Sequence, residues 1–211
     1  MQLYEKYRPQ TLDDFIGQPK MKKQLQTIMG RSEFDRDAFW IQGPSGTGKT
    51  SLAHIIANRL VETDQAIIEL DGDECNVAML NDIKYSIGLY PAKGKWKVYI
   101  VNEAHAMSRQ AVQGWLTLLE KLPKYRLVIF TTTELIQDDL FGNFSSPFAR
   151  RCKVLNFTNQ GLAQDMAERT REISQCEGLD GKPITAYVRL IQDCKNNLGL
   201  ALQRIEAGEM I

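Results

Sequence analysis

Residues 43–50 read GPSGTGKT, a complete match to the pattern G-x-x-x-x-G-K-[ST] of loops that bind nucleotide phosphates. Glycines let such a loop turn and present N–H groups to phosphate oxygens, and a helix that begins directly after it adds its positive dipole end. Lys49 would reach the β- and γ-phosphates, and Thr50 would offer its hydroxyl to Mg²⁺. We therefore expect ATP and Mg²⁺ to bind at Gly43, Pro44, Ser45, Gly46, Thr47, Gly48, Lys49, Thr50 and Ser51.

A second set of polar residues follows the apolar segment 98–101, where the sequence reads Asn102-Glu103-Ala104-His105. P-loop ATPases usually place an acid here that holds Mg²⁺ through water, and a second acid that polarises the attacking water. Glu103 fits the second role, so we expect it to be catalytic. Asn102 stands in the first position, where an amide oxygen can accept a hydrogen bond from metal-bound water but brings no charge. We therefore expect weaker Mg²⁺ binding and slower hydrolysis, with a structural or orienting role for His105.

The elements that would position these groups alternate along the chain. Helical spacing of apolar residues predicts helices at 49–60, 76–87 and 108–122, the last with Ser108 as its N-cap. Apolar runs predict strands at 37–42, 66–70, 96–101, 126–133 and 153–157. Strands of this kind that alternate with helices indicate a parallel sheet covered on both faces. The expected fold class is α/β, with a five-stranded parallel sheet flanked by helices.

The pattern changes after Thr158, because the rest of the sequence predicts only helices, at 159–176, 183–195 and 198–206. We therefore expect two domains, a P-loop ATPase domain over 1–158 and a small all-helical lid over 159–211. The lid has too few helices for a large core of its own, so we expect it to pack on the first domain.

Composition limits the classes of protein and partner. Lys and Arg together number 26, as do Asp and Glu, so the formal net charge is zero and gives no indication of DNA binding. No apolar run approaches the roughly 18 residues of a membrane span, and the first ten residues lack the apolar core of a signal peptide. The cysteines are too widely spaced for a zinc site. We expect a cytoplasmic protein with no membrane partner. Its cysteines would be reduced thiols: Cys75, Cys152, Cys176 and Cys194.

Several segments, taken in order, resemble clamp-loader ATPases, the AAA+ family of the bacterial DNA polymerase III gamma subunit and the small subunits of replication factor C. The box YEKYRPQTLDDFIGQ at 4–18 precedes the phosphate loop, and VYIVNEAHAMSRQAVQGWLTLLEKLP follows at 98–123. FTTTE at 130–134 resembles the end of the sensor-1 strand, and FARRCKVLNF at 148–157 resembles the segment before the last strand. The resemblance covers about residues 4–207.

This resemblance implies roles for further residues. Thr133 would be sensor 1, a hydroxyl that touches the γ-phosphate or the attacking water, with Thr132 as the alternative. Arg151 would be an arginine finger acting in trans on the neighbouring subunit's ATP, since a guanidinium is always charged and grips phosphate bidentately. The adjacent Arg150 leaves that assignment open by one residue. The adenine pocket would be lined by Tyr7, Arg8, Pro9, Ile16 and Gly17.

Two departures from the family pattern concern the C-terminal part. Gly199 stands where the family has its sensor-2 arginine, and Arg204 lies one helical turn further on. The family's third domain, a helical collar that holds a pentamer, has no counterpart before the sequence ends at Ile211. We expect either a piece of a longer chain or a form that assembles through its ATPase domains or with a partner.

The resemblance implies a subunit that hydrolyses ATP, joins other AAA+ subunits, and loads a sliding clamp onto primer-template DNA. The apolar tip Leu89-Tyr90-Pro91 is a candidate clamp contact, with packing on its own core as the alternative. DNA contacts would be made to the phosphate backbone. The candidates, each of which also fits a solvated face, are Lys84, Lys93, Lys95, Lys97, Arg109, Gln110 and Gln113.

Two other functions stay open. The first is a nucleotide-binding subunit that does not hydrolyse ATP, which Asn102 and Gly199 favour because both positions lack a charge near the γ-phosphate. The second is another AAA+ machine, such as a branch-migration helicase or an unfoldase. The KYRP box at 6–9 and the lack of an aromatic-rich pore loop argue against it.

Overall fold

The computed structural model describes residues 1–32, 34–134 and 145–211. Within them, the centre is a parallel sheet whose strands lie in the order β2-β3-β4-β1-β5. The strands are β1 (Arg36–Gln42), β2 (Ile67–Asp71), β3 (Lys97–Asn102), β4 (Arg126–Thr132) and β5 (Lys153–Asn156). The three central strands are almost wholly buried, because helices cover both faces of the sheet. The predicted α/β class with five parallel strands is confirmed.

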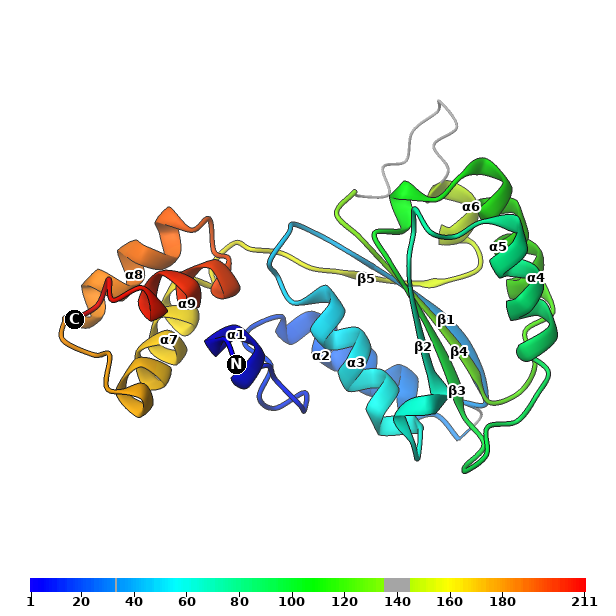
Figure 1. Ribbon diagram of the computed structural model, residues 1–211, viewed down its shortest axis with the longest axis horizontal. Helices are drawn as coiled ribbons and strands as arrows, with labels where there is room; N and C mark the ends of the chain where they lie inside the picture. Colours follow the sequence, from blue (N-terminus) through cyan, green and yellow to red (C-terminus); the bar gives the residue numbers. More distant parts are fainter. Residues whose placement is uncertain (33, 135–144) are drawn as a thin grey trace.

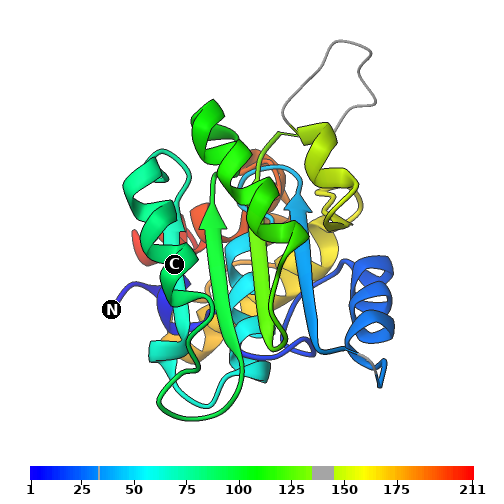
Figure 2. The same cartoon turned by 90° about the vertical axis from the view of Figure 1, so that its right-hand side faces the viewer.

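Helices form a layer on each face of this sheet (Figures 1 and 2). One face carries α4 (Val77–Ser86), α5 (Arg109–Glu120) and the short α6 (Ser145–Ala149), and the other carries α2 (Pro19–Met29) and α3 (Lys49–Leu60). Successive strand residues alternate between the two layers, so Trp40 and Phe130 pack under α5 while Ile41 and Ile129 pack under α3. The sheet therefore holds the ends of β1, β3 and β4 at one common edge.

A third core lies away from the sheet. It is built from α7 (Ala163–Glu177), α8 (Ile184–Asp193) and α9 (Leu198–Glu206), and it also includes Leu3 of the N-terminal α1 (Leu3–Lys6). Tyr7 Oη donates to Glu177 over 2.5 Å, and Lys6 Nζ lies 2.6 Å from the same carboxylate. The N-terminal segment therefore packs with the C-terminal helices, and both chain termini lie at that end of the molecule (Figure 1).

Gln18 links the N-terminal segment to the connection between β5 and α7. Its buried side chain donates to Thr158 O over 2.5 Å and accepts from Thr158 N over 3.2 Å. Thr158 is the position after which the sequence predicts a second domain. The division into domains 1–158 and 159–211 stays a prediction. Under this division α1 belongs to the first domain by sequence but packs with the helices of the second.

The predicted strands and helices match those of the structure within a few residues, and the short helices α1 and α6 were not predicted. The helix expected at 159–176 begins only at Ala163, after a turn in which Gly161 has φ +71°. Helix α2 was not predicted, although Met21, Leu25 and Ile28 have helical spacing and Pro19 stands at its start. Among the described residues, no helix is long and apolar enough to cross a membrane.

Candidate functional site

The phosphate loop connects β1 to α3 at the edge where the strands end. Gly46 and Gly48 have φ +74° and +92°, a region that favours glycine, and Gly48 is the residue from which α3 begins. A Cβ at Gly48 would lie 2.8 Å from the ring of Phe15, so that ring already fills the space next to Gly48. The sequence therefore folds locally into a turn whose N–H groups and helix start form a cradle for phosphate.

Lys49 lies inside this loop and is buried. Its ammonium group donates to Gly43 O and to Pro44 O, each over 2.9 Å. Burial lowers the pKa of Lys49, and the negative charge of Glu103 opposes that shift. The loop's own carbonyl groups thus hold the cation at the centre of the cradle.

A cavity of about 650 Å³ opens beside the loop, between the N-terminal segment, α3, α7 and α9. This size suits a ligand as large as a nucleotide. The loop residues from Ser45 to Ser51 line it together with Glu103. Of the five residues predicted for the adenine pocket, four line it: Tyr7, Arg8, Pro9 and Ile16.

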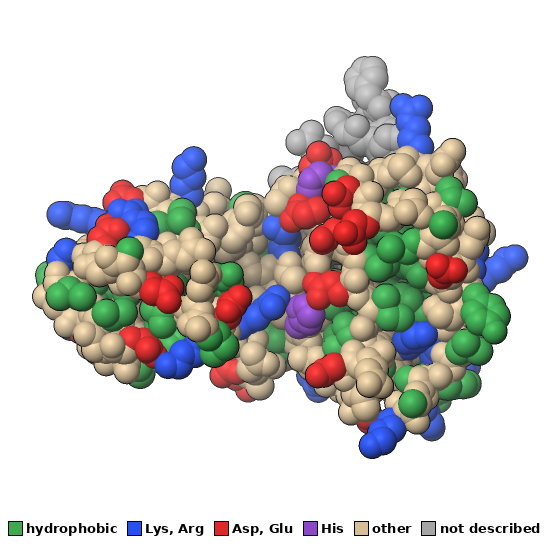
Figure 3. All heavy atoms as spheres, viewed as in Figure 1, with side chains coloured by type: hydrophobic (Ala, Val, Ile, Leu, Met, Phe, Trp, Pro, Cys, Tyr) green, Lys and Arg blue, Asp and Glu red, His purple; other side chains and the backbone are tan. Residues whose placement is uncertain are grey.

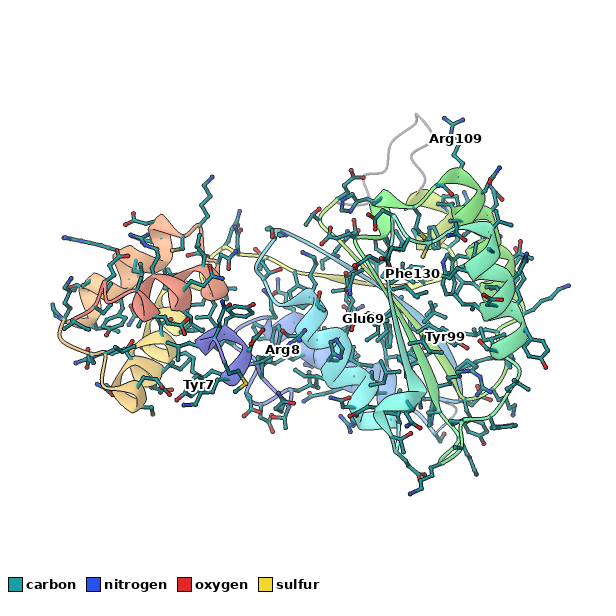
Figure 4. The ribbon with its side chains drawn as sticks, in the orientation of Figure 1. Tyr7, Arg8, Glu69, Tyr99, Arg109 and Phe130 are labelled. Carbon is teal, nitrogen blue, oxygen red and sulfur yellow. The ribbon has the colours of Figure 1, made fainter. Side chains whose placement is uncertain are left out.

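Gly17, the fifth of these residues, is not among the lining residues. It has φ +66°, and a Cβ there would overlap with the side chain of Leu162. Arg8 belongs to the N-terminal segment and extends toward α3, where its Nε donates to Ser51 Oγ over 3.3 Å (Figure 4). Gly17 thus sets the close approach of the N-terminal segment to α7, while Arg8 fastens that segment to the loop's helix.

A polar cluster lies where β3 ends. Asn102 Oδ1 accepts from Thr50 Oγ1 over 3.2 Å and from Thr131 Oγ1 over 3.1 Å, while its Nδ2 donates to Glu69 Oε1 over 2.6 Å. Figure 3 shows acidic and His side chains gathered here, beside the hollow that separates the sheet from the C-terminal helices. The cluster brings the predicted residues Thr50 and Asn102 into direct contact.

Glu103 follows with φ +46°, an uncommon conformation for a residue with a side chain and one that concentrates at functional sites. Its Oε2 lies 3.4 Å from His105 Nδ1, and that nitrogen is also 3.1 Å from Thr132 Oγ1. Glu103 lines the cavity and its side chain is half exposed, so it can reach a ligand there. His105 thus contacts both Glu103 and Thr132, and its predicted structural or orienting role stays a prediction.

Thr131 and Thr132 end β4, Thr133 follows it, and the three side chains differ in what they contact. Thr131 reaches Asn102 and Thr132 reaches His105, whereas the half-buried Thr133 has no side-chain hydrogen bond within the described ranges. Thr133, with Thr132 as its alternative, stays a prediction for sensor 1. Thr131, which the sequence did not single out, is the one of these three whose hydroxyl donates to Asn102.

Arg151 lies between α6 and β5 and does not line the cavity. Its guanidinium forms an ion pair with Glu120 at the end of α5, and Nη1 donates to Pro147 O over 3.2 Å. Arg150 is exposed beside it. In this arrangement Arg151 does not reach the cavity of its own chain. The predicted action in trans is compatible with this position and stays a prediction.

The residues of α9 at the cavity differ from the expected sensor 2. Gly199 lines the cavity, as does Asn197, whereas Arg204 does not. Arg204 is held elsewhere, since its Nε donates to Glu209 Oε2 over 2.6 Å. Asn197 was missed in the sequence, where it is recognisable only as the N-cap of α9.

The surface of α4 and of the loop after it carries large exposed apolar side chains. Tyr85, Leu89 and Tyr90 are exposed by 79%, 52% and 64%, and Val77 is half exposed. The buried Arg126 donates to Leu89 O over 2.8 Å and lies 5.2 Å from the Tyr90 ring centroid. Within the tip predicted at Leu89-Tyr90-Pro91, Arg126 thus binds the backbone at Leu89, while the side chains of Leu89 and Tyr90 are exposed.

Comparison with known proteins gives one matching family model and many relatives. The model described as "Holliday junction DNA helicase RuvB P-loop domain" matches residues 7–112. The chain is 30% identical over 190 residues to "DNA polymerase III subunit gamma/tau" of Mycoplasma pneumoniae, covering 79% of this chain and 27% of that protein. It is 30% identical over 186 residues to "Replication factor C small subunit" of Aeropyrum pernix, covering 83% and 53%. The chain thus spans between a quarter and about half of these relatives.

Solved structures share the fold. The Thermotoga maritima "RuvB Holliday junction branch migration motor" superposes with a TM-score of 0.68 and 22% identity, over 95% of this chain and 64% of that one. A mutant form of the same motor gives a TM-score of 0.70 and 21% identity over the same shares. At this identity the likeness extends to the architecture of the sheet and its helices and no further.

Proposed function

The chain belongs to the AAA+ clamp-loader ATPase family, and from that premise we propose that it hydrolyses ATP to load a sliding clamp onto primed DNA. The observation that carries the proposal is that Lys49, Thr50 and Glu103 line one cavity of about 650 Å³ with the last three residues of the N-terminal KYRP box, 7–9. A phosphate cradle, a candidate base and a wall for the adenine thus meet in one place. The names of the curated relatives supply the role in replication.

Each residue has a proposed part in this reaction. The loop N–H groups and Lys49 bind the phosphates, and Glu103 orients and polarises the attacking water. Thr133 contacts the γ-phosphate or that water, and Arg151 of one subunit reaches the ATP of its neighbour. Tyr7, Arg8, Pro9 and Ile16 hold the adenine, with Gly17 keeping their segment in place.

The residues at the end of β3 fit Mg²⁺. Within the described ranges no group of three or more His, Cys, Asp or Glu side chains could hold a metal. A hydroxyl and an amide oxygen are hard donors, and Mg²⁺ commonly takes its other ligands from water and phosphates. Thr50 would hold the ion and Asn102 would act through water. When bound, the ion neutralises charge that develops on the transferred phosphate.

The partners follow from the same proposal. The exposed apolar residues of the α4 region, Val77, Tyr85, Leu89 and Tyr90, are the candidate face for the sliding clamp. Arg109, which projects outward from the start of α5, is a candidate contact for the DNA backbone (Figure 4). Other AAA+ subunits would adjoin through the Arg151 side. The site of action would be that of DNA replication, the cytoplasm in a cell without a nucleus.

Asn102 and Gly199 favour a second candidate, a subunit that binds ATP without hydrolysing it. Steady-state ATP hydrolysis with Mg²⁺, with and without primed DNA and the cognate clamp, tests both. We expect clamp and DNA together to raise the rate well above that of Lys49→Ala, and Glu103→Gln to abolish the rise while ATP still binds.

Two other outcomes would reject the proposed function. ATP binding without hydrolysis in every mixture would identify a structural nucleotide-binding subunit. Stimulation by four-way junction DNA, but not by primed DNA with clamp, would instead favour the branch-migration activity named for the RuvB domain.

A further inference from the structure

Glu69 is a residue of β2 whose carboxylate contacts the predicted metal-binding residue Asn102, although no sequence motif includes it. Its Oε1 accepts from Asn102 Nδ2 over 2.6 Å. Its Oε2 lies 3.0 Å from His54 Nε2. Both carboxylate oxygens therefore have partners, one on β3 and one on α3, and Glu69 faces the space between them (Figure 4).

This contact fixes which way the Asn102 amide points. An ionised carboxylate only accepts hydrogen bonds, so the NH₂ end of Asn102 must face Glu69. Oδ1 then faces the other way, where Thr50 and Thr131 donate to it over 3.2 and 3.1 Å. The reversed amide would set an oxygen against the carboxylate and an NH₂ group against the place of a cation.

His54, which holds one oxygen of Glu69, lies on α3, the helix that begins at the end of the phosphate loop. His54 follows Thr50 by four residues on α3, so the two side chains lie on one face of that helix. Contacts thus run from Thr50 through Asn102 and Glu69 to His54, and they join β2 and β3 to α3 at two points. A shift of Glu69 would disturb Asn102 and the start of α3 together.

We propose that Glu69 is a positioning residue for Mg²⁺-nucleotide binding: it holds the Asn102 oxygen toward the ion bound at Thr50. Glu69 also supplies, from the neighbouring strand β2, a negative charge close to the position where Asn102 has none. A short hydrogen bond to a carboxylate polarises the amide and makes its oxygen a better acceptor for metal-bound water. This inference rests on the proposed ATP site but not on clamp loading.

Nucleotide binding by the full chain tests it without any need for turnover. A fluorescent ADP analogue and unlabelled ATPγS serve as probes, titrated in EDTA and then against increasing Mg²⁺. We expect Glu69→Gln to raise the Mg²⁺ concentration for half-maximal binding by roughly tenfold or more, as loss of such outer partners does elsewhere. Its affinity in EDTA and its melting temperature should stay close to those of the unmodified chain.

A charge exchange sharpens the test. Asn102→Asp alone sets two carboxylates against each other, so we expect it not to improve Mg²⁺ dependence. Glu69→Gln combined with Asn102→Asp turns the same hydrogen bond around and should restore near-normal Mg²⁺ dependence. Glu62→Gln makes the same chemical change in an exposed residue after α3, and should have no effect.

The outcomes separate the possibilities. An unchanged Mg²⁺ requirement in Glu69→Gln would overturn the proposal, and so would an equal loss of affinity with and without Mg²⁺, which marks a merely structural ion pair. If Glu69→Gln fails to fold, Glu69→Asp, which keeps the charge but shortens the reach, must still shift the Mg²⁺ requirement. Failure of the unmodified chain to bind nucleotide would overturn the proposed function as well, whereas failure of clamp loading alone would not affect this inference.

Discussion

Asn197, the first residue of the turn that begins α9, lies directly against Gly46 of the phosphate loop. A Cβ at residue 46 would overlap with the carboxamide of Asn197. Asn197 Oδ1 accepts from Leu200 N over 3.1 Å, so the NH₂ end of the amide is the end available to the loop. The C-terminal helices therefore contact the phosphate cradle through one short polar side chain, two residues before Gly199, the position that resembles the family's sensor-2 site.

Gly46→Ala tests how much the cradle depends on this approach. The alanine would be strained at φ +74° and would displace Asn197, so we expect a loss of about 1–3 kcal/mol in the free energy of unfolding. Nucleotide affinity should fall as well. Denaturant titration and nucleotide binding measure the two effects. Gly88→Ala is the matched control, because nothing lies within 4 Å of a Cβ there; equal effects at the two positions would contradict the expectation.

Asn197 has two separable tasks, capping α9 and contacting the loop. Asn197→Ala removes both and should lower the free energy of unfolding by about 1 kcal/mol. Asn197→Ser keeps an oxygen that can cap the helix but removes the amide, so it should preserve stability. We expect both variants to bind ATP more weakly. If the serine variant binds ATP as tightly as the unmodified chain, the contact with Gly46 has no part in nucleotide binding.

Arg151 is expected to act on a neighbouring subunit, and mixing variants can show this. Arg151→Ala should bind ATP yet hydrolyse it slowly, and Lys49→Ala should not bind ATP. In a mixture, an intact Arg151 from the second variant can reach ATP bound by the first. We expect an ATPase rate above the sum of the two separate rates. A mixture that only equals this sum would argue against action in trans, and Arg150→Ala tests the adjacent residue in the same assay.

Asp180 stabilises the packing of α7 against α8. Hydrogen bonds from Gln175 and from Tyr187, at 2.9 Å each, lower the pKa of Asp180 below its usual 3.8, and the charge of Arg171 adds to them. A carboxyl whose pKa is lower in the folded chain stabilises it above the unfolded pKa, and this contribution disappears as pH falls through the folded pKa.

Asp180→Asn should therefore lower the free energy of unfolding at neutral pH, and its difference from the unmodified chain should shrink as pH falls below about 4. Urea titrations over this range measure the difference. Asp193→Asn, at an exposed position of α8, is the control. A difference that stays constant with pH would show that the charge of Asp180 is not the cause.

The phosphate loop, the strands and most helices could be predicted because their signals are local. GPSGTGKT specifies its own turn through glycines, and apolar runs of strand length predict β1, β3 and β4 without knowledge of their neighbours. Glu103 could be found in the same way, since it directly follows a recognisable strand. The positions of these parts at one sheet edge then follow from parallel pairing.

Tertiary structure alone decided the contacts between distant segments. Glu69 and Asn102 are far apart in sequence and meet because β2 pairs with β3, and Asn197 reaches Gly46 because α9 folds back over the loop. The choice of Thr131 as the partner of Asn102 depends on the register and twist of β4, which no residue type specifies. Hydrogen-bond partners require positions accurate to a few tenths of an ångström, and these arise only when the whole core packs.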